Sequence, residues 1–214
     1  MKKLIIFLLV ITPCSLFAQI GIKAGVNFAQ ISKASEINSS TRSGFHAGIF
    51  LAPASKKIIT SRTELLYSRQ GYDYKSSTKT GNVDLDYFMQ AQLVGINITR
   101  FVQLQFGAQT AILLNAKVDS TGGTGSAGAN PYGKILDLYN RFDYGYALGA
   151  EIHPIMGLVI GARYNVSLNK VYKDIQSFQR PSFTSADAKN NVVMVSVGWR
   201  FGKTGREKKK NDNE

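Results

Sequence analysis

The chain reads Phe142-Asp-Tyr-Gly-Tyr-Ala-Leu-Gly-Ala-Glu-Ile152 near the middle of its second half. Apolar or aromatic side chains hold every second position, and Asp, Gly, Ala and Glu stand between them. Successive side chains of a β-strand point to opposite faces. A period of two residues therefore predicts a strand with one apolar face and one face of polar or small residues.

The same period recurs in seven further segments. Four follow it cleanly, at residues 20–31, 102–112, 158–168 and 193–201. Three follow it less regularly, at residues 44–51, 59–72 and 85–93, and in these an apolar side chain interrupts the polar face at Phe50, Leu66 and Phe88. Together the segments predict eight strands.

The connections between these segments alternate in length. Short connections lie at residues 53–56, 97–100 and 154–157, and long ones at 32–41, 73–84, 115–140 and 170–189. In outer-membrane barrels the short turns all lie at the periplasmic end and the long loops at the other end. The chain is therefore expected to be all-β, an eight-stranded antiparallel up-and-down transmembrane β-barrel with both ends of the strand set on the short-turn side.

The polarity of the two faces separates this barrel from a soluble one. A soluble eight-stranded barrel holds its apolar side chains inside. Here the polar face carries charges and amides that suit a narrow, filled interior, and the apolar face suits lipid. We expect an interior network made of Arg62, Glu64, Gln90, Gln92, Gln103, Gln105, Glu151, Arg163 and Arg200. The same face also carries Lys23, Asn27, His46, Gln109 and Asn165.

Aromatic side chains bunch near the ends of the predicted strands. One group lies toward the long loops, namely Tyr67, Tyr72, Tyr87, Phe142 and Tyr144. A second group lies toward the short turns, namely Phe101, Trp199 and Phe201. Two such groups are expected where a barrel crosses the two membrane interfaces.

The N-terminus has the layout of a secretory signal. Lys2 and Lys3 precede an apolar run at residues 4–12, and Ala18 offers a small residue before Gln19. We expect residues 1–18 to be a removed signal peptide, 19–202 the barrel and 203–214 a polar basic tail. Cys14 is the only cysteine, and lipidation there is the minor alternative because Pro13 precedes it.

The formal net charge of +12 raises the question of an acidic partner. Much of the excess lies in the expected loops and in the tail. Acidic headgroups or nucleic acid could meet such a tail, but it is short and lacks the interleaved aromatics of single-strand binders. A solvated tail is the favoured interpretation, so no nucleic acid is expected, and the expected partners are outer-membrane lipid, the outer-membrane assembly machinery and an extracellular ligand or envelope protein.

Catalytic and metal sites find little support in the sequence. His46 and His153 are the only histidines, and they are not at ligand spacing. His46 with Ser43 or Asp86 could form a hydrolytic set, but no nucleophile-elbow motif supports one. The glycine-rich run at residues 122–128 and Gly133-Lys134 do not make a phosphate loop, because Ile135 follows. No catalytic residue, cofactor or metal is predicted.

Two stretches resemble a known family. Gly21-Ile-Lys-Ala-Gly-Val-Asn-Phe28 and Val195-Ser-Val-Gly-Trp-Arg-Phe201 resemble strands of the small outer-membrane β-barrel domain proteins described as porin-family or PorT-like. The resemblance covers the mature chain and implies its fold and its location in the bacterial outer membrane. It transfers no site residues. The polar tail after Phe201 departs from the many outer-membrane barrels that end on the aromatic itself.

Three functions remain open from the sequence. The first is a structural or surface-interaction barrel that acts through long extracellular loops. The second is a narrow porin-like channel for small solutes, which the small interior of an eight-stranded barrel disfavours. The third is a barrel enzyme acting on lipid or peptide, which the missing motifs disfavour.

Overall fold

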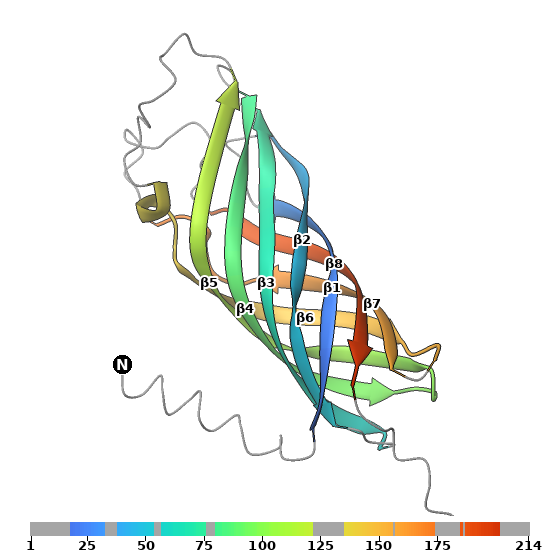
Figure 1. Cartoon of the computed structure of the whole chain (residues 1–214). Helices are drawn as coiled ribbons and strands as arrows, with labels where there is room; N and C mark the ends of the chain where they lie inside the picture. The colour runs from blue at the N-terminus through green and yellow to red at the C-terminus, as the bar shows by residue number, and fades with distance from the viewer. Residues whose placement is uncertain are drawn as a thin grey trace, which may run out of the picture.

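The computed structural model describes residues 18–32, 38–53, 57–75, 80–121, 135–155, 157–173, 185 and 187–201. Within them lie eight β-strands and one short 3-10 helix (Figure 1). The elements are β1 Ala18–Ser32, β2 Asn38–Pro53, β3 Ile59–Lys75, β4 Thr80–Asn97, β5 Val102–Thr121, η1 Ile135–Leu138, β6 Phe142–Ile152, β7 Leu158–Ser167 and β8 Lys189–Arg200.

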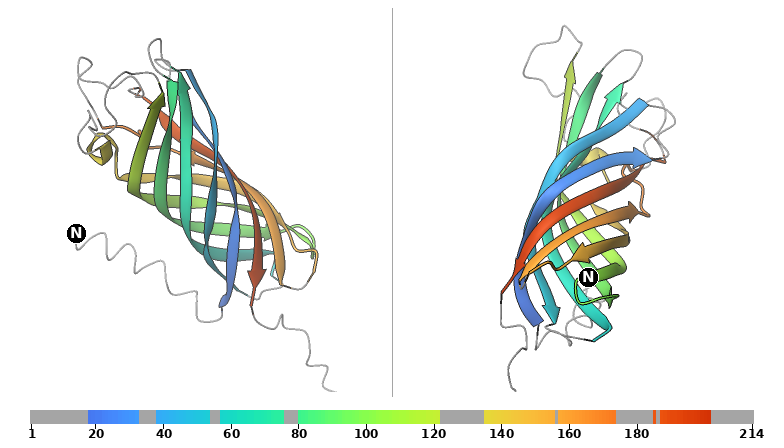
Figure 2. Two further views of the ribbon diagram at one scale, coloured as in Figure 1. Left: turned by 45° about the horizontal axis from the view of Figure 1, so that its top comes forward. Right: turned by 90° about the vertical axis from the view of Figure 1, so that its right-hand side faces the viewer.

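The strands form a closed barrel in chain order. Each strand pairs antiparallel with its neighbours in the sequence, and β1 pairs with β8 from Gly21 opposite Arg200 to Ser32 opposite Lys189. The closing pair runs side by side in both views of Figure 2. The predicted fold class is therefore confirmed. No helix in the described part of the chain has the length and apolar composition needed to cross a membrane.

Four strands extend further than the alternation alone predicted. β2 begins at Asn38, and β3, β4 and β5 continue through residues 73–75, 80–84 and 113–121. Parts of the expected loops at 32–41, 73–84 and 115–140 are thus strand. The polar composition that suggested loops reflects an outer face that lies beyond the apolar surface. The inner face of these extensions keeps buried side chains such as Tyr74 and Val83.

We call the part of this extension made by residues 69–75 of β3, 80–86 of β4 and 115–121 of β5 the projecting sheet. Its pairing is continuous from Arg69 opposite Asp86 to Lys75 opposite Thr80, and from Asp86 opposite Asn115 to Thr80 opposite Thr121. Figure 1 shows these strands rising past the shorter strands of the barrel. The barrel is therefore lopsided, with one wall taller than the other.

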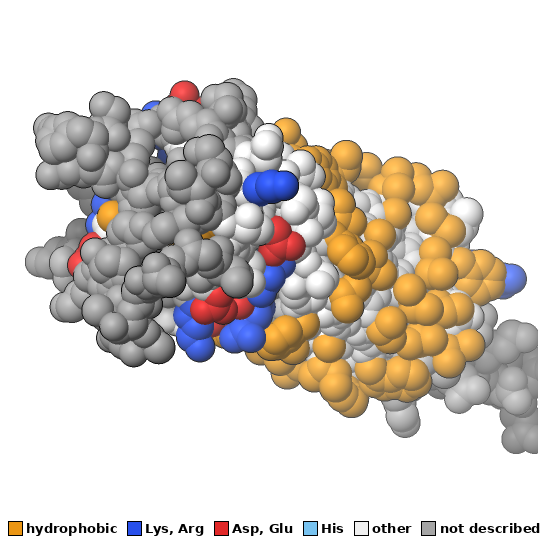
Figure 3. All heavy atoms as spheres, turned by 90° about the horizontal axis from the view of Figure 1, so that it is seen from above, with side chains coloured by type: hydrophobic (Ala, Val, Ile, Leu, Met, Phe, Trp, Pro, Cys, Tyr) orange, Lys and Arg blue, Asp and Glu red, His pale blue; other side chains and the backbone are white. Residues whose placement is uncertain are grey.

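The outer face of the barrel is apolar, as the alternation predicted. Side chains that are 40–61% exposed come from strands all around the ring, among them Ile22, Val26, Phe45, Phe88, Phe106, Leu148, Tyr164 and Val197. Figure 3 shows hydrophobic side chains over much of the barrel wall that faces the viewer. Large apolar side chains exposed in such numbers do not suit water and require an apolar solvent.

Some of the aromatic side chains expected at the two ends of the barrel do lie on its outer face. Phe142 and Tyr144 at one end, and Phe101, Trp199 and Phe201 at the other, are 43–50% exposed on the outer face. Tyr72 and Tyr87 were expected among them, but this expectation is wrong because both are buried inside the barrel. They occupy inward positions of β3 and β4, where the taller wall needs apolar filling.

The predicted domain limits fall largely beyond the described residues. β1 begins at Ala18, the last residue of the predicted signal peptide. Residues 1–17 and the tail at 203–214 lie outside the described part of the chain. The signal peptide and the basic tail therefore remain predictions.

Candidate functional site: the filled barrel interior

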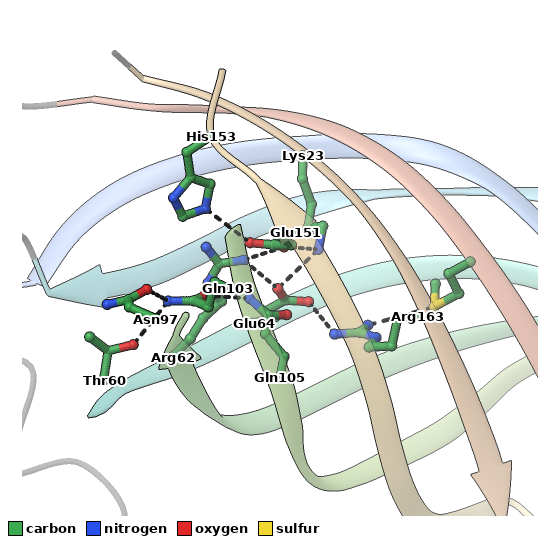
Figure 4. Close-up of polar contacts among 11 residues, drawn as sticks. Lys23, Thr60, Arg62, Glu64, Asn97, Gln103, Gln105, Glu151, His153 and Arg163 are labelled. Carbon is green, nitrogen blue, oxygen red and sulfur yellow. Dashed lines mark hydrogen bonds and ion pairs between the residues drawn. The ribbon is translucent and has the colours of Figure 1, made fainter. Parts of the chain in front are cut away.

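Glu64 of β3 lies at the centre of a buried group of charges. Its Oε1 is 3.0 Å from Nζ of Lys23, and its Oε2 is 2.7 Å from Nη1 of Arg163. Arg62, on the same strand, brings its Nη1 within 3.4 Å of Oε1. Figure 4 shows these side chains converging from β1, β3 and β7 toward the barrel axis. The carboxylate is fully buried and has a cation on three sides.

Glu151 of β6 is the second carboxylate of this group. Its Oε1 accepts a hydrogen bond from Nη1 of Arg62 and lies 3.6 Å from Nζ of Lys23. His153 places its Nε2 3.6 Å from the other carboxylate oxygen. We call Lys23, Arg62, Glu64, Glu151 and Arg163 the charged layer.

Three cations and two carboxylates make up the charged layer, and each residue is at most 7% exposed. Burying an isolated charge costs several kcal/mol, roughly, and mutual pairing offsets this cost only when the contacts are close. The short contacts across the ring therefore hold β1, β3, β6 and β7 at fixed distances. The layer also fills the cross-section, because long side chains from opposite walls meet at its centre.

Amide side chains continue the polar interior toward the short turns. Gln105 donates from Nε2 to Oε1 of Gln103 (2.8 Å), and Gln103 donates from Nε2 to Oδ1 of Asn97 (2.8 Å) and to Oγ1 of Thr60 (3.1 Å). These contacts appear beside the charged layer in Figure 4. Because these amide donors and acceptors bond one another, few of them are free to bind water along a channel through the barrel.

An aromatic ring is packed beside the charged layer. The guanidinium of Arg62 lies 4.6 Å from the ring centroid of Phe50, a cation–π contact. Phe50 is fully buried and packs with Ala52 and Val159. Gly21 admits the ring, because a Cβ at this position would lie 2.2 Å from Cζ of Phe50. The apolar interruption of β2 in the sequence is thus part of the interior packing.

On the other side of the charged layer lies a set of neutral polar side chains. Nδ1 of His46 donates to Oδ1 of Asn27 (2.7 Å), whose Nδ2 donates to Oγ of Ser68 (3.0 Å). Gln70 donates from Nε2 to the same serine oxygen (2.9 Å) and accepts from Nδ2 of Asn190. The interior here is again occupied by side chains that bond one another, although Nε2 of His46 and Oδ1 of Asn190 are buried without a hydrogen-bond partner among the described residues.

The loop end of the interior is apolar and aromatic. Tyr72, Tyr139 and Tyr172 are buried in one cluster with Val83 and Leu85. The hydroxyl groups of Tyr72 and Tyr172 are in contact, and the rings of Tyr139 and Tyr172 lie 5.0 Å apart between centroids. Tyr139 and Tyr172 also form an isolated β-bridge outside the strands. Burial raises the pKa of both these phenols above the ordinary range.

Most of the predicted network lies in this interior. Arg62, Glu64, Glu151 and Arg163 meet in the charged layer, and Gln103 and Gln105 meet in the amide chain. Arg200 ends β8, pairs its backbone with Gly157, and makes no ion pair among the described contacts. Lys23 was placed on the polar face but was left out of the predicted network, although strict alternation along β1 already turned it inward.

Gln90 and Gln92 are corrections. Both were expected in the interior network, but they lie on the outer face of β4, and Oε1 of Gln92 accepts from Oγ1 of Thr63 (2.7 Å). The inward positions of this strand belong to Met89, Ala91 and Leu93, which are at most 3% exposed. A small or apolar β4 leaves room for the long side chains that reach across from the opposite wall.

The suggested hydrolytic set is not assembled. His46 faces the interior and bonds Asn27, whereas Asp86 pairs with Arg69, whose side chain lies on the outer face. Ser43 is exposed. The barrel wall separates the histidine from the carboxylate. Within the described residues, no three His, Cys, Asp or Glu side chains gather as metal ligands would.

Ion pairs follow the outer face where the apolar surface ends. Arg42 pairs with Asp73 (2.9 Å) and Asp84 (2.6 Å), and Arg69 pairs with Asp86 (2.8 Å). Figure 3 shows basic and acidic side chains gathered beside the apolar surface at this border. A change from apolar to charged side chains along a wall is expected where it leaves a bilayer.

A closed ring with an apolar outside and a charged, filled inside defines a transmembrane β-barrel of the small, eight-stranded class. Comparison with protein families agrees: residues 14–173 match the family described as outer membrane protein beta-barrel domain. The chain belongs to this family, and its location is the bacterial outer membrane, with the apolar surface in contact with lipid.

Solved structures of outer-membrane barrels are similar to the chain at low identity. Neisserial surface protein A is 18% identical, over 85% of this chain and 97% of that one, with a TM-score of 0.49. The attachment invasion locus protein Ail of Yersinia pestis is 15% identical, over 87% and 100% of the two chains, with a TM-score of 0.47. OprG of Pseudomonas aeruginosa is 9% identical, over 87% and 97%, with a TM-score of 0.45. No curated protein matches the chain.

Proposed function

We propose that this barrel is an interaction protein of the cell surface. Its membrane part serves as a closed anchor, and the projecting sheet with the loops at that end binds a partner outside the cell. Long connections of outer-membrane barrels lie on the extracellular side, which supports this orientation. The single observation that carries the proposal is the interior, which is packed with side chains at every level described above.

The packing argues against the narrow channel. The charged layer, the neutral polar set and the tyrosine cluster follow one another along the axis. A solute passing through would have to break ion pairs such as Arg163 with Glu64, whose atoms are 2.7 Å apart. Removing a partner from a buried pair costs about 3 to 5 kcal/mol. Side chains held this firmly oppose a stable open path.

The positions of the polar groups also argue against the barrel enzyme. His46 bonds an amide and not an acid or a hydroxyl, and Asp86 and Ser43 lie elsewhere. A nucleophile and its base need direct hydrogen-bond reach. We therefore propose no catalytic residue and no cofactor. The assembly machinery of the outer membrane and an extracellular ligand or envelope protein are the proposed partners.

A capture experiment on living cells tests the proposal. The barrel carries an affinity tag in a periplasmic turn, and a membrane-impermeant cross-linker fixes surface contacts before solubilisation. The matched control keeps the eight strands but has short Gly-Ser linkers in place of residues 122–134 and 174–184. Heat-modifiable migration in gels checks that both proteins are folded.

We expect the intact protein to retain a specific cross-linked partner that the shortened protein loses. The same partners at the same yield with both proteins would contradict an interaction through the loop end. A partner bound only from the periplasmic side, and thus absent with an impermeant reagent, would contradict it as well.

A further inference from the structure

A groove lies on the outer surface where β7, β8, β1 and β2 run side by side (Figure 2). Its volume is about 440 Å³, and nearly all of its surface is apolar. The side chains that line it include Ile22, Ala24, Ala47, Leu158, Val197 and Trp199. They alternate along their strands with buried residues such as Lys23 and Val159, so the groove opens toward lipid and not into the interior.

Two alanines on neighbouring strands form the floor of the groove. Ala24 of β1 lies opposite Ala47 of β2 on one side and opposite Val197 of β8 on the other. In the next row toward the short turns, Ile22 lies opposite Trp199, and these larger side chains border the floor. Rows of side chains on one face of a strand are roughly 7 Å apart, whereas a helix with its side chains is about 10 to 12 Å across. The groove therefore suits a hydrocarbon chain better than a protein helix.

The groove ends beside the point where the chain leaves the barrel. β8 ends one residue after Trp199, at the short turns, and the amide of Phe201 donates to the carbonyl of Ile20 (2.8 Å). Residues 203–214 lie outside the described part of the chain, but Lys203 follows Phe201 by two positions, so their Cα atoms are at most about 7 Å apart. The groove and the start of the tail therefore lie at the same membrane border.

Positive charge is concentrated in the part of the tail nearest the barrel. Five basic residues and Glu207 fall within positions 203–210, and Asp212 and Glu214 come after them. The basic residues are Lys203, Arg206, Lys208, Lys209 and Lys210. Basic clusters beside a membrane attract the headgroups of anionic lipids. A lipid phosphate at the end of the groove therefore meets opposite charge.

We propose that the groove and the tail together bind one anionic phospholipid of the leaflet that faces the periplasm. One acyl chain lies over Ala24 and Ala47, and the basic side chains of the tail hold the phosphate. The leaflet follows from the orientation of outer-membrane barrels, whose short turns face the periplasm. The sequence alone favoured a solvated tail, and the apolar groove beside its first residues is the observation that changes this interpretation. The site lies at the opposite end of the barrel from the proposed surface interaction and does not depend on it.

Trp199 provides a probe inside the groove, because it is the single tryptophan of the chain. Barrel purified from the cell envelope is reconstituted in bilayers that contain phosphatidylcholine and phosphatidylglycerol, with bromine on the acyl chains of one lipid at a time. Bromine quenches the indole only on contact, so the two quenching curves give the relative association constant of the two lipids at this site. Native mass spectrometry then counts the phosphatidylglycerol molecules that stay bound after dilution in detergent.

We expect phosphatidylglycerol to be preferred at Trp199 about threefold to tenfold, and the preference to fall as salt is raised. The variant K203Q/R206Q/K208Q/K209Q/K210Q should reduce the preference to about one. Arg100→Gln is the control, because it removes a basic residue from a short turn on the opposite wall. It should leave the preference unchanged.

Filling the groove tests the place of the acyl chain. Ala24→Leu with Ala47→Leu should abolish retention of the single bound phosphatidylglycerol. Ala108→Leu adds the same apolar bulk to the outer face of β5 and should retain the lipid. Heat-modifiable migration in gels checks that every variant is folded.

Equal association of the two lipids, an unchanged preference after neutralisation of the tail, or the same retention by the two leucine variants would overturn the proposal. Trp199 that escapes quenching by both lipids, in protein that cross-links as a dimer, would show that a second copy of the chain covers the groove, and the lipid proposal would then be wrong.

Discussion

Arg163 and Glu64 meet across the barrel axis although 99 positions separate them in the chain, with Nη1 of the arginine 2.7 Å from Oε2 of the carboxylate. One comes from β7 and the other from β3, so neither adjacent strand pairing nor local sequence brings them together. Their contact depends on closure of the whole ring. Loss of the carboxylate leaves Lys23, Arg62 and Arg163 with Glu151 alone.

Glu64→Ala should lower the free energy of unfolding by about 3 to 5 kcal/mol, because it leaves buried cations unpaired. Urea titration in lipid vesicles, followed by the fluorescence of Trp199, the single tryptophan, measures the change. Ser61→Ala on the outer face of the same strand is the control, with an effect of about 0.5 kcal/mol or less. Equal midpoints for the two variants would show that the charged layer does not stabilise the barrel.

Thr63 and Gln92 form a polar pair on the lipid-facing side, and a double-mutant cycle tests this placement. Thr63→Val alone leaves the carbonyl of the amide without its donor and should cost about 1 to 3 kcal/mol. Thr63→Val with Gln92→Leu replaces both partners by apolar groups and should be near neutral or stabilising. If the double variant is the less stable one, Gln92 faces the interior, as the sequence alone suggested.

Charge placed on the outer face of β5 should be sensitive to height along the strand. Ala108→Arg introduces an arginine into the apolar surface and should cost about 2 to 4 kcal/mol. Asp119→Arg changes an exposed position of the same strand in the projecting sheet and should cost about 0.5 kcal/mol or less. The yields of folded protein and the urea midpoints compare the two. A similar loss for both would place the membrane border above residue 119.

The eight strands could be predicted because alternation decides the faces wherever polar and apolar residues keep to separate positions. β4 was the exception: Phe88, Gln90 and Gln92 share one face, and Met89, Ala91 and Leu93 share the other, so neither face is clearly polar. The short turn after β4 decides which face is inside, because it fixes the register of β4 against β5. If the turn pairs Asn97 with Gln103, the register along the two strands places Ala91 opposite Gln109 and Gln92 opposite Ala108. Residues that lie directly opposite each other face the same side of the sheet, so Gln92 faces outward with Ala108.

The site was predictable only in composition. The polar face of each strand could be assigned from the sequence, but the partners of Glu64 follow from closure and strand tilt, which residue spacing does not contain. The projecting sheet was missed for a different reason. Above the bilayer the outer face of a strand becomes polar, and a polar strand has the composition of a loop.

We expect the packing around Tyr139 and Tyr172 at the loop end to lose stability at alkaline pH. Unfolded tyrosine ionises near pH 10, about its ordinary pKa, whereas burial raises the pKa of both these phenols. The unfolded state therefore loses protons first, so the stability of the loop-end packing is fully present below pH ~10 and declines as the pH rises above it. Ultraviolet titration should show a late phase of tyrosinate formation. Tyr139→Phe with Tyr172→Phe should reduce that phase, and an unchanged late phase would contradict burial of these two phenols.

Electrical conduction tests the central claim, the filled interior, most directly. Monomeric protein refolded into planar bilayers is recorded beside a porin reconstituted in the same way, which shows that the assay detects an open barrel. Because the charged layer and the tyrosine cluster block the axis, we expect no stable, large-conductance open state, and no sugar uptake in liposome swelling. A steady porin-sized conductance from verified monomer would contradict the closed anchor and establish the barrel as a channel.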